Sequence, residues 1–251
     1  MSETRDERAS QQAESGAKSA VPDLVWARPS GGRRPKLSRE AIVEAAIKLG
    51  DSEGLEAVSI RRVAGELGVR AMSLYTHIER KEDLLALMVD EVIPEILVRG
   101  ELPADWREAI SLIARKERDY ILRHPWIVEL SSQANLPHLG PNALRHVEQS
   151  LAAVSGLTDD PQARVEIVAA VDHYMLGFVV REVTHRQRKQ LAGLGEDDPD
   201  GLAHPYFRDL IASGEFPHLR DVFSRGIYGG QHFEQGLTWL LDGIERQYGV
   251  G

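Results

Sequence analysis

Residues 37–92 have the sequence LSREAIVEAAIKLGDSEGLEAVSIRRVAGELGVRAMSLYTHIERKEDLLALMVDEV. Its first apolar residues, from Ile42 to Leu49, recur at the three- and four-residue spacing of one helix face. Ser38 stands where an N-cap side chain is needed, and Gly54 stands where a helix commonly stops. The pattern predicts a first helix from about Arg39 to Glu53.

Two shorter helices follow with little chain between them. Ser59 is a candidate N-cap for the second helix, whose apolar stripe runs from Ile60 to Leu67 and which Gly68 ends. The third helix is expected over 71–78 and a fourth from Lys81 to about Val98. Two short helices joined by a tight turn form the helix-turn-helix pattern, in which the second helix enters the major groove of DNA.

The outward face of this helix pair is short, polar and basic. Residues 59–81 carry five lysines and arginines against two glutamates, although the whole chain has a formal net charge of −9. A small basic face on an acidic body suits a protein that touches DNA with one end only. Spacing alone leaves a second interpretation open, namely an amphipathic helical hairpin with a solvated polar face.

Residues 37–92 resemble the N-terminal DNA-binding domain of the tetracycline-repressor (TetR) family. The resemblance lies in Gly54 after the first helix, in SIRRVAGELGV at 59–69 and in SLYTHIERKEDLL at 73–85. It implies an all-α fold, in which a three-helix helix-turn-helix domain precedes a helical ligand-binding and dimerisation domain. The expected boundaries are a disordered tail over 1–37, a DNA-binding domain over 38–84 and the second domain over 85–251.

The resemblance also implies a role for each matching position of the DNA-binding face. Ser59 and Arg61 are expected near phosphates and adjacent bases, and Arg70 is the best candidate for reading guanine, with a simple phosphate contact as the alternative. A cluster of basic residues in the tail, Arg33, Arg34 and Lys36, is either a minor-groove arm or a solvated segment. The remaining assignments are Ala71, Ser73 and Thr76 facing bases, and Tyr75, His77 and Lys81 on the DNA backbone.

The second half resembles the tetracycline-repressor branch, through DWREAISLIARKERDYILRHPWIVEL at 105–130, LGPNALRHVEQSLAAV at 139–154, YMLGFVVRE at 174–182 and HFEQGLTWLLDGIE at 232–245. Two apolar helices, at 165–180 and 231–248, are expected to hold a homodimer, with burial inside a monomer as the alternative. Further helices are expected over 104–123, 125–132, 140–155, 160–190 and 203–213, with a mobile loop over 191–202.

A pocket for an unidentified small-molecule inducer is expected between these helices. Nothing identifies that molecule, and simple core packing is the alternative for each candidate residue. Inducer entry is expected to change the spacing of two recognition helices held roughly 34–36 Å apart on double-stranded operator DNA. The pocket candidates are Trp126, Asn142, His146, His173, Met175 and Phe178.

Composition and motif content argue against a membrane protein, a secreted protein and an enzyme. The chain has no cysteine, and 42% of its residues are hydrophobic, enough for a sizeable core. It has no run of about 18 apolar residues and a polar start, so neither a membrane span nor a signal peptide is expected, and we expect a cytoplasmic protein. No catalytic motif, metal site or cofactor site is expected. A small helical enzyme and a dimerisation adaptor without DNA binding remain as alternatives.

Overall fold

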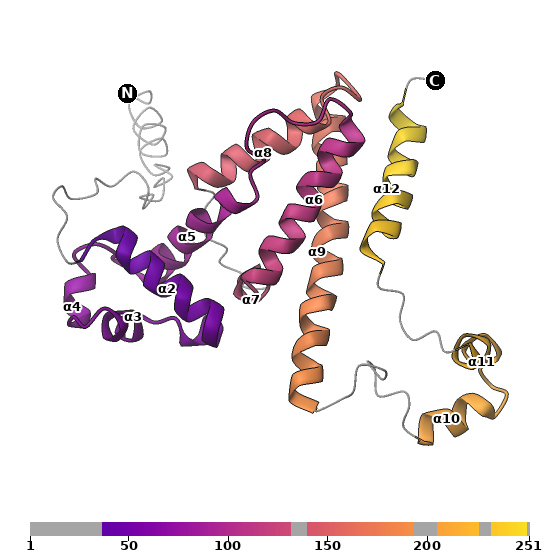
Figure 1. The fold of residues 1–251 in the computed structure, drawn as a ribbon, viewed down its shortest axis with the longest axis horizontal. Coiled ribbons are helices and arrows are strands. Elements are labelled where there is room, and N and C mark those ends of the chain that lie inside the picture. The colour runs from indigo at the N-terminus through magenta and orange to yellow at the C-terminus, as the bar shows by residue number, and fades with distance from the viewer. Residues whose placement is uncertain (1–36, 132–139, 193–204, 226–231, 250–251) are drawn as a thin grey trace, which may run out of the picture.

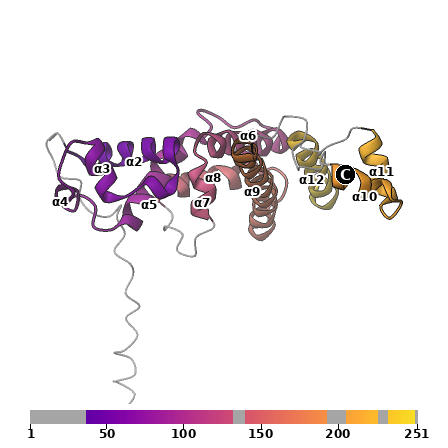
Figure 2. The same ribbon diagram turned by 90° about the horizontal axis from the view of Figure 1, so that it is seen from below.

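The computed structural model describes residues 37–131, 140–192, 205–225 and 232–249. Within these ranges every regular element is a helix, as the sequence predicts. Figures 1 and 2 show α2–α4 at one end of an elongated molecule and α10–α11 at the other. The helices are α2 (Arg39–Glu53), α3 (Ile60–Glu66), α4 (Ala71–Leu74), α5 (Lys81–Val92), α6 (Trp106–Arg123), α7 (Trp126–Ser131), α8 (Pro141–Ala153), α9 (Pro161–Ala192), α10 (Pro205–Ala212), α11 (Pro217–Ser224) and α12 (Phe233–Tyr248), with short 3-10 helices η2 (Leu55–Ala57) and η3 (Ile93–Glu95).

The first helix begins and ends where the sequence predicts, and the second begins at its predicted cap. The Ser38 hydroxyl accepts a hydrogen bond from the Ala41 N–H, and the Ser59 hydroxyl accepts one from the Arg62 N–H. Gly54 ends α2 at φ 85°, and Gly68 makes the turn after α3 at φ 64°. Both angles lie in the left-handed region that glycine adopts without a steric penalty. These local signals account for the bounds of α2, the start of α3 and the turn that follows α3.

Two predicted helix ends are wrong. The third helix does not run to Ile78, because α4 ends at Leu74 and the Thr76 hydroxyl donates to the Ser73 carbonyl at 2.7 Å, an alternative to helical bonding. The fourth helix ends at Val92 rather than Val98, because Pro94 has no N–H to donate and its ring favours the tighter η3 turn.

Two other differences concern the start of the ordered chain and its C-terminal part. Leu37, expected in the disordered tail, packs half-buried against the core. A helix that was not expected, α11, occupies Pro217–Ser224. The rest of the tail expectation (1–36), and most of the expected mobile loop over 191–202, lie outside the described residues.

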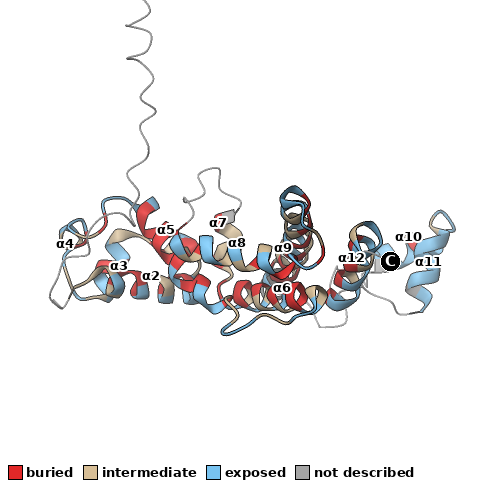
Figure 3. Ribbon diagram, turned by 90° about the horizontal axis from the view of Figure 1, so that it is seen from above, coloured by how far each residue is buried: buried red, intermediate tan, exposed pale blue. Residues whose placement is uncertain are grey.

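The helical body is built around α6 and α9. The inner stripe of α9 includes Ile167, Val171, Met175 and Val179, which are at most 6% exposed. Figure 3 shows buried residues concentrated along α5, α6 and α9, whereas α10 and α11 are mostly exposed. No described helix is long and apolar enough to cross a membrane.

Polar bonds attach α12 to this body. The Tyr174 hydroxyl donates to the Phe233 carbonyl at 2.7 Å, and Arg115 makes a two-pronged ion pair with Glu234. Arg107 bonds Asp242 and Glu245 further along the helix. The C-terminal helix is therefore fixed along its length, with its other side left open.

Candidate nucleic-acid interface and its connection to the body

The predicted reading face stands on a buried apolar platform. Leu74 and Ile78 are 0% exposed, and Val63 of α3 is equally buried beneath them. The Val69 N–H bonds the Ala64 carbonyl at 3.0 Å and closes the turn between α3 and α4. Five of the nine predicted contact residues are exposed on this platform and four are half-buried. The exposed ones are Arg61, Arg70, Tyr75, Thr76 and Lys81, and the half-buried ones are Ser59, Ala71, Ser73 and His77.

Some side chains of this face are already engaged within the protein. The Ser59 oxygen caps α3, which leaves its hydroxyl hydrogen available to a phosphate. The Thr76 hydroxyl hydrogen goes to the Ser73 carbonyl, so Thr76 offers an oxygen acceptor and a methyl group outward. Arg62 is paired with Glu53 at 2.6 Å, which reduces the positive charge available on α3.

Met72 is the residue of this face that sequence reasoning missed. It is 74% exposed, the most exposed of the large apolar side chains on the described surface. Met72 is apolar, whereas DNA-contacting residues are usually predicted from polar side chains. Its position between two predicted base-facing residues, Ala71 and Ser73, nevertheless indicates that it faces the DNA. An exposed methionine here can contact the thymine methyl group in a major groove.

Two of the predicted pocket residues also join the body to the first helices. Trp126 is fully buried, and its Nε1–H donates to the Asp51 Oδ1 atom at 2.7 Å. Asn142, at the start of α8, donates its backbone N–H to Asp90 Oδ1 and its amide to the Asp90 carbonyl, both at 2.9 Å. Asp90 thus caps α8 from α5, a favourable place for a carboxylate.

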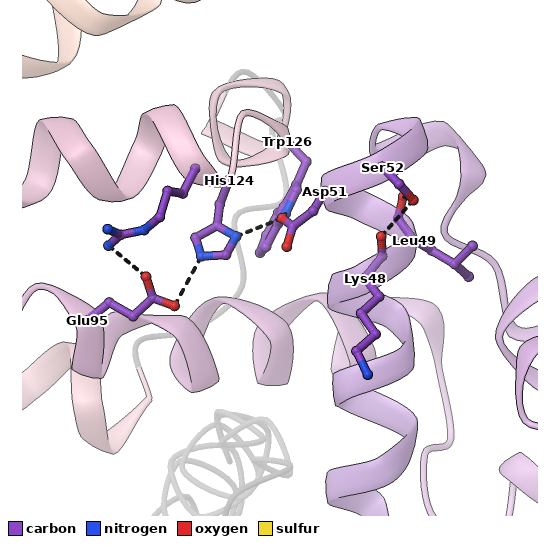
Figure 4. A network of polar contacts seen from close by, with 8 residues as sticks. Lys48, Leu49, Asp51, Ser52, Glu95, His124 and Trp126 are labelled. Carbon is purple, nitrogen blue, oxygen red and sulfur yellow. Dashed lines mark hydrogen bonds and ion pairs between the residues drawn. The ribbon is translucent and has the colours of Figure 1, made fainter.

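A histidine connects three segments at the same junction (Figure 4). His124 Nδ1 lies 2.7 Å from Asp51 Oδ1, and His124 Nε2 lies 3.3 Å from Glu95 Oε1. Arg123 bonds the other Glu95 oxygen at 2.7 Å. Glu95 lies in η3 and Asp51 in α2, so this network ties the start of α7 to both. No local pattern in the sequence marks these pairings, because the partners are far apart along the chain.

The junction also contains an open cleft of about 550 Å³. Its walls come from the end of α2, from α7 and from α9, and include Trp126, Glu129 and Arg186. The Glu129 carboxylate accepts the Leu55 N–H at 3.3 Å across this region. The end of α2 is therefore attached to the body by hydrogen bonds from side chains that line this cleft.

The other four predicted pocket residues divide into three environments. Met175 is buried, and Phe178 is half-buried against the rings of Tyr174 and Phe233. His173 is exposed, so in one protomer it does not face the core. His146 Nε2 lies 2.5 Å from Glu117 Oε1 of α6.

Two carboxylates near His146 were missed by sequence reasoning. Glu117 is 4% exposed, and Asp172 lies on α9 close enough to act on His146 electrostatically. Burial opposes the charge of His146, but the hydrogen bond and charge of Glu117, with a smaller effect of Asp172, outweigh it and raise its pKa. Displacement of water and then the charge of Glu117 raise the pKa of Asp172 to about 7. The body therefore holds a charged cluster that extends from the surface at Asp172 to the buried Glu117, and the protonation of each member depends on the others.

The sequence matches two family descriptions that together span the helices described above. Residues 42–88 match "Bacterial regulatory proteins, tetR family", and residues 99–248 match "Tetracyclin repressor-like, C-terminal domain". A curated relative, the HTH-type transcriptional repressor DrrR1 of Streptomyces coeruleorubidus, is 35% identical over 89% of this chain and 84% of its own length.

Solved structures agree with these matches. ActR of Streptomyces coelicolor, in complex with actinorhodin, superposes with a TM-score of 0.69 at 27% identity, covering 86% of this chain and all of ActR. BioQ, solved with its natural double-stranded DNA operator, superposes with a TM-score of 0.58 at 25% identity, covering 84% of this chain and 99% of BioQ.

Proposed function

Since this chain belongs to the TetR family of bacterial transcriptional regulators, we propose that it is a repressor that binds an operator as a homodimer and releases it when a small molecule binds. The observation that carries the proposal is the exposed polar and basic face of α3–α4, held on the buried platform of Val63, Leu74 and Ile78. BioQ, a structural neighbour, was solved on double-stranded operator DNA, which supports the same use of this end.

We assign the contacts as the sequence suggests, with one addition. Arg70 and Met72 read base edges together with Ala71, Ser73 and Thr76. Tyr75, His77 and Lys81, with Ser59 and Arg61 of the α3 start, hold the DNA backbone. The DNA-binding unit is then 38–84 and the regulatory unit 85–251, with the boundary inside α5. Both units act in the cytoplasm, where the operator is.

The homodimer is expected to form on the open sides of α9 and α12. Trp239 is 69% exposed on α12, opposite the side that contacts α9. On α9, a Cβ atom added at Gly177 would have no described atom within 4 Å. A helix of another protomer can therefore approach α9 closely at this glycine. Burial of such apolar surface favours association by about 25 cal/mol per Å². A partner copy supplies the second recognition helix that a palindromic operator requires.

The junction supplies a route from ligand to DNA. The Asp90–Asn142 bond joins α5 to α8, and the Asp51–Trp126 bond joins α2 to α7. A molecule that moves α8 or α7 therefore also moves α5 or α2. The spacing of two recognition helices then changes, and operator affinity falls. Coupling of this kind is typically about 1–3 kcal/mol and is reciprocal. ActR, which was solved with actinorhodin, supports a ligand-responsive body.

Selection of binding sites from random duplexes tests the proposal. The recovered sites should contain two inverted half-sites about one helical turn apart, and a size-calibrated gel shift should show one dimer per site. A double variant, Tyr75→Phe with Lys81→Ala, should recover the same consensus with weaker binding. Failure to enrich any sequence, or one protomer per site, contradicts the proposed function.

A further inference from the structure

Three ionisable side chains lie near one another where α6, α8 and α9 pack together: Glu117 bonds His146, and Asp172 acts on both electrostatically. Glu117 comes from α6, His146 from α8 and Asp172 from α9. Glu117 is 4% exposed, whereas Asp172 is exposed, so the cluster extends from the surface into the interior. The family resemblance explains the helices but not this combination of two carboxylates and one imidazole.

The cluster has unused hydrogen-bonding atoms. Glu117 Oε1 bonds His146 Nε2 at 2.5 Å, but Glu117 Oε2 is buried and has no partner among the described residues. His146 Nδ1 is likewise buried without one within the same residues. Because unsatisfied buried polar atoms are rare and costly, such a pair of atoms in one cluster indicates a partner that binds from outside.

The charge of the cluster indicates what that partner carries. Two carboxylates oppose one imidazole, and the surroundings add further negative charge. The pKa of the buried Tyr120 hydroxyl, one turn along α6, is raised by burial and then by the carboxylates of Glu95, Asp90 and Glu117. A cationic group is therefore attracted, and an anionic group is repelled.

From this geometry we propose that the Glu117–His146–Asp172 cluster recognises the protonated amine of the small-molecule ligand. The amine donates to Glu117 Oε2 and to the Asp172 carboxylate, and His146 Nδ1 remains for an oxygen of the same molecule. Buried apolar residues lie one turn away on each side, Ile113 and Ile121 on α6 and Met175 on α9, so the ligand carries an apolar or aromatic part beside the amine. The proposal rests on the ligand-responsive function proposed above.

A metal ion is a poorer occupant for this cluster. Across residues 37–131, 140–192, 205–225 and 232–249, no three His, Cys, Asp or Glu side chains are placed to hold one. A purely structural role, in which Glu117 and His146 only tie α6 to α8, predicts no preference among ligands, and the experiment separates it from the proposal.

The probes are three small aromatic compounds of similar size and different charge, namely benzylamine, benzyl alcohol and benzoate. Each is titrated calorimetrically into the full-length protein at neutral pH. We expect benzylamine to bind at least about tenfold more tightly than benzyl alcohol, since a hydrogen bond to a charged group contributes that much. Benzoate should bind most weakly. Repeating the benzylamine titration in buffers of different ionisation enthalpy should show proton release, because the amine displaces the proton of Asp172.

Isosteric variants assign the preference to the cluster. Glu117→Gln and Asp172→Asn keep the shape and remove one charge each, and both should lose most of the preference for benzylamine. Proton release should disappear in Asp172→Asn. The matched control is Glu166→Gln, which changes an exposed carboxylate on α9 whose one hydrogen bond among the described residues is to the Gln162 amide. This variant should bind all three probes as the wild type does. If Glu117→Gln fails to fold, Asp172→Asn still tests the proposal, because Asp172 is exposed and its substitution should leave the fold intact.

Equal affinity for the three probes, or no binding of any of them at millimolar concentration, overturns the proposal. So does an amine preference that survives in Asp172→Asn. These measurements contain no DNA, so they fail or succeed independently of operator binding. If site selection enriches no operator while the amine preference holds, the proposed function is wrong and the amine site stands.

Discussion

Arg70 is exposed at the N-cap position of α4, with extended backbone and no side-chain capping bond. Among the described residues its guanidinium has no hydrogen-bond or ion-pair partner, so it can reach a base edge beyond the helix start. Arg70→Ala should weaken operator binding by about 1–3 kcal/mol and relax the choice of base at one position per half-site. Site selection repeated with the variant measures both effects.

Two further variants separate base reading from simple charge at Arg70. Arg70→Lys keeps the charge but loses the two-pronged geometry, so it should also relax the preference. Arg62→Ala, which removes an arginine already paired with Glu53, should change the consensus little. A uniform loss across all sequences in Arg70→Ala would mean that Arg70 contacts phosphate.

Met72 offers a different kind of contact from its neighbours, an apolar one. If its side chain packs on a thymine methyl group, replacing that thymine by uracil should weaken binding by about 0.8 kcal/mol, the value of one buried methyl-sized group. Competition gel shifts with thymine and uracil duplexes measure this. In Met72→Ala the two duplexes should bind alike, and an unchanged thymine preference in that variant would exclude the contact.

At the scale of elements, Gly140 decides how closely α8 approaches α5. A Cβ atom at position 140 would overlap the Asp90 carboxylate, which caps α8 by accepting the Asn142 and Ala143 N–H groups. Gly140→Ala should therefore destabilise the fold by about 1–3 kcal/mol. Urea unfolding measures the loss. Gly156→Ala is the matched control, since nothing lies within 4 Å of its added atom, and an equal loss in both variants would contradict the overlap.

The elements that the sequence predicts well are those with local signals. Ser38, Ser59 and Gly54 act within one turn of their own position, so the bounds of α2 and the start of α3 follow from chain order. The end of α5 was overestimated although Pro94 is visible in the sequence, because the apolar periodicity continues past it. The short α4 ends where the Thr76 hydroxyl bonds the Ser73 carbonyl. The sequence does not show whether this hydroxyl bonds the backbone or points to solvent.

Candidate residues of the interior were harder to predict. Trp126 and Asn142 remain candidate pocket residues, but the sequence does not reveal that they also bond Asp51 and Asp90, which are 75 and 52 residues away in the chain. Glu117 and Asp172 resemble ordinary charges on an exposed helix face when only spacing is considered. Their proximity to His146 follows from the packing of α6, α8 and α9, which no single helix encodes.

At the scale of the whole molecule, the open side of α12 should hold the dimer. Trp239→Glu should yield a folded monomer that no longer binds the operator, because the charge would lie in the seam. Val179, which the sequence places in an apolar dimerisation helix, is 0% exposed within the protomer. Val179→Glu should instead destabilise the fold by about 3–5 kcal/mol without releasing a folded monomer.

Sedimentation at micromolar concentration, combined with thermal unfolding, distinguishes the two outcomes. Gln247→Glu adds a charge at an exposed position of the same helix and serves as the control, expected to remain dimeric. A dimer of normal stability in Trp239→Glu would place the interface elsewhere.

The charged cluster should also give the protein a characteristic dependence of stability on pH. The Asp172 carboxyl lies at the surface edge of the cluster, where the packed helices displace part of its surrounding water. This loss of water, and then the charge of Glu117 on α6, raise its pKa to about 7, whereas the charge of His146 on α8 lowers it. Folding then favours the protonated carboxyl, so stability falls as pH rises from about 4 to 7. The raised pKa of His146 acts in the same direction, since its contribution is lost as pH rises through the folded value.

Thermal unfolding of wild type and Asp172→Asn between pH 5.5 and 8 measures this effect. The wild type should lose stability with rising pH relative to the variant, whose asparagine does not titrate. Glu40 and Glu234, whose pKa values are lowered, titrate below this window and do not contribute to the difference. Parallel curves for the two proteins would show that Asp172 is ionised in the fold as it is in the unfolded chain.

The bond from Trp126 to Asp51 sets a rule for building hybrid regulators. A hybrid that takes residues 38–84 from another regulator keeps Trp126 in the recipient but replaces both Asp51 and Gly50. Trp126 is fully buried, and a Cβ atom at position 50 would already lie 3.0 Å from its ring. A donor without an acceptor at 51 leaves the indole N–H buried and unsatisfied, at a cost of about 1–3 kcal/mol. Compatible donors can therefore be chosen by these two positions before their recognition helices are considered.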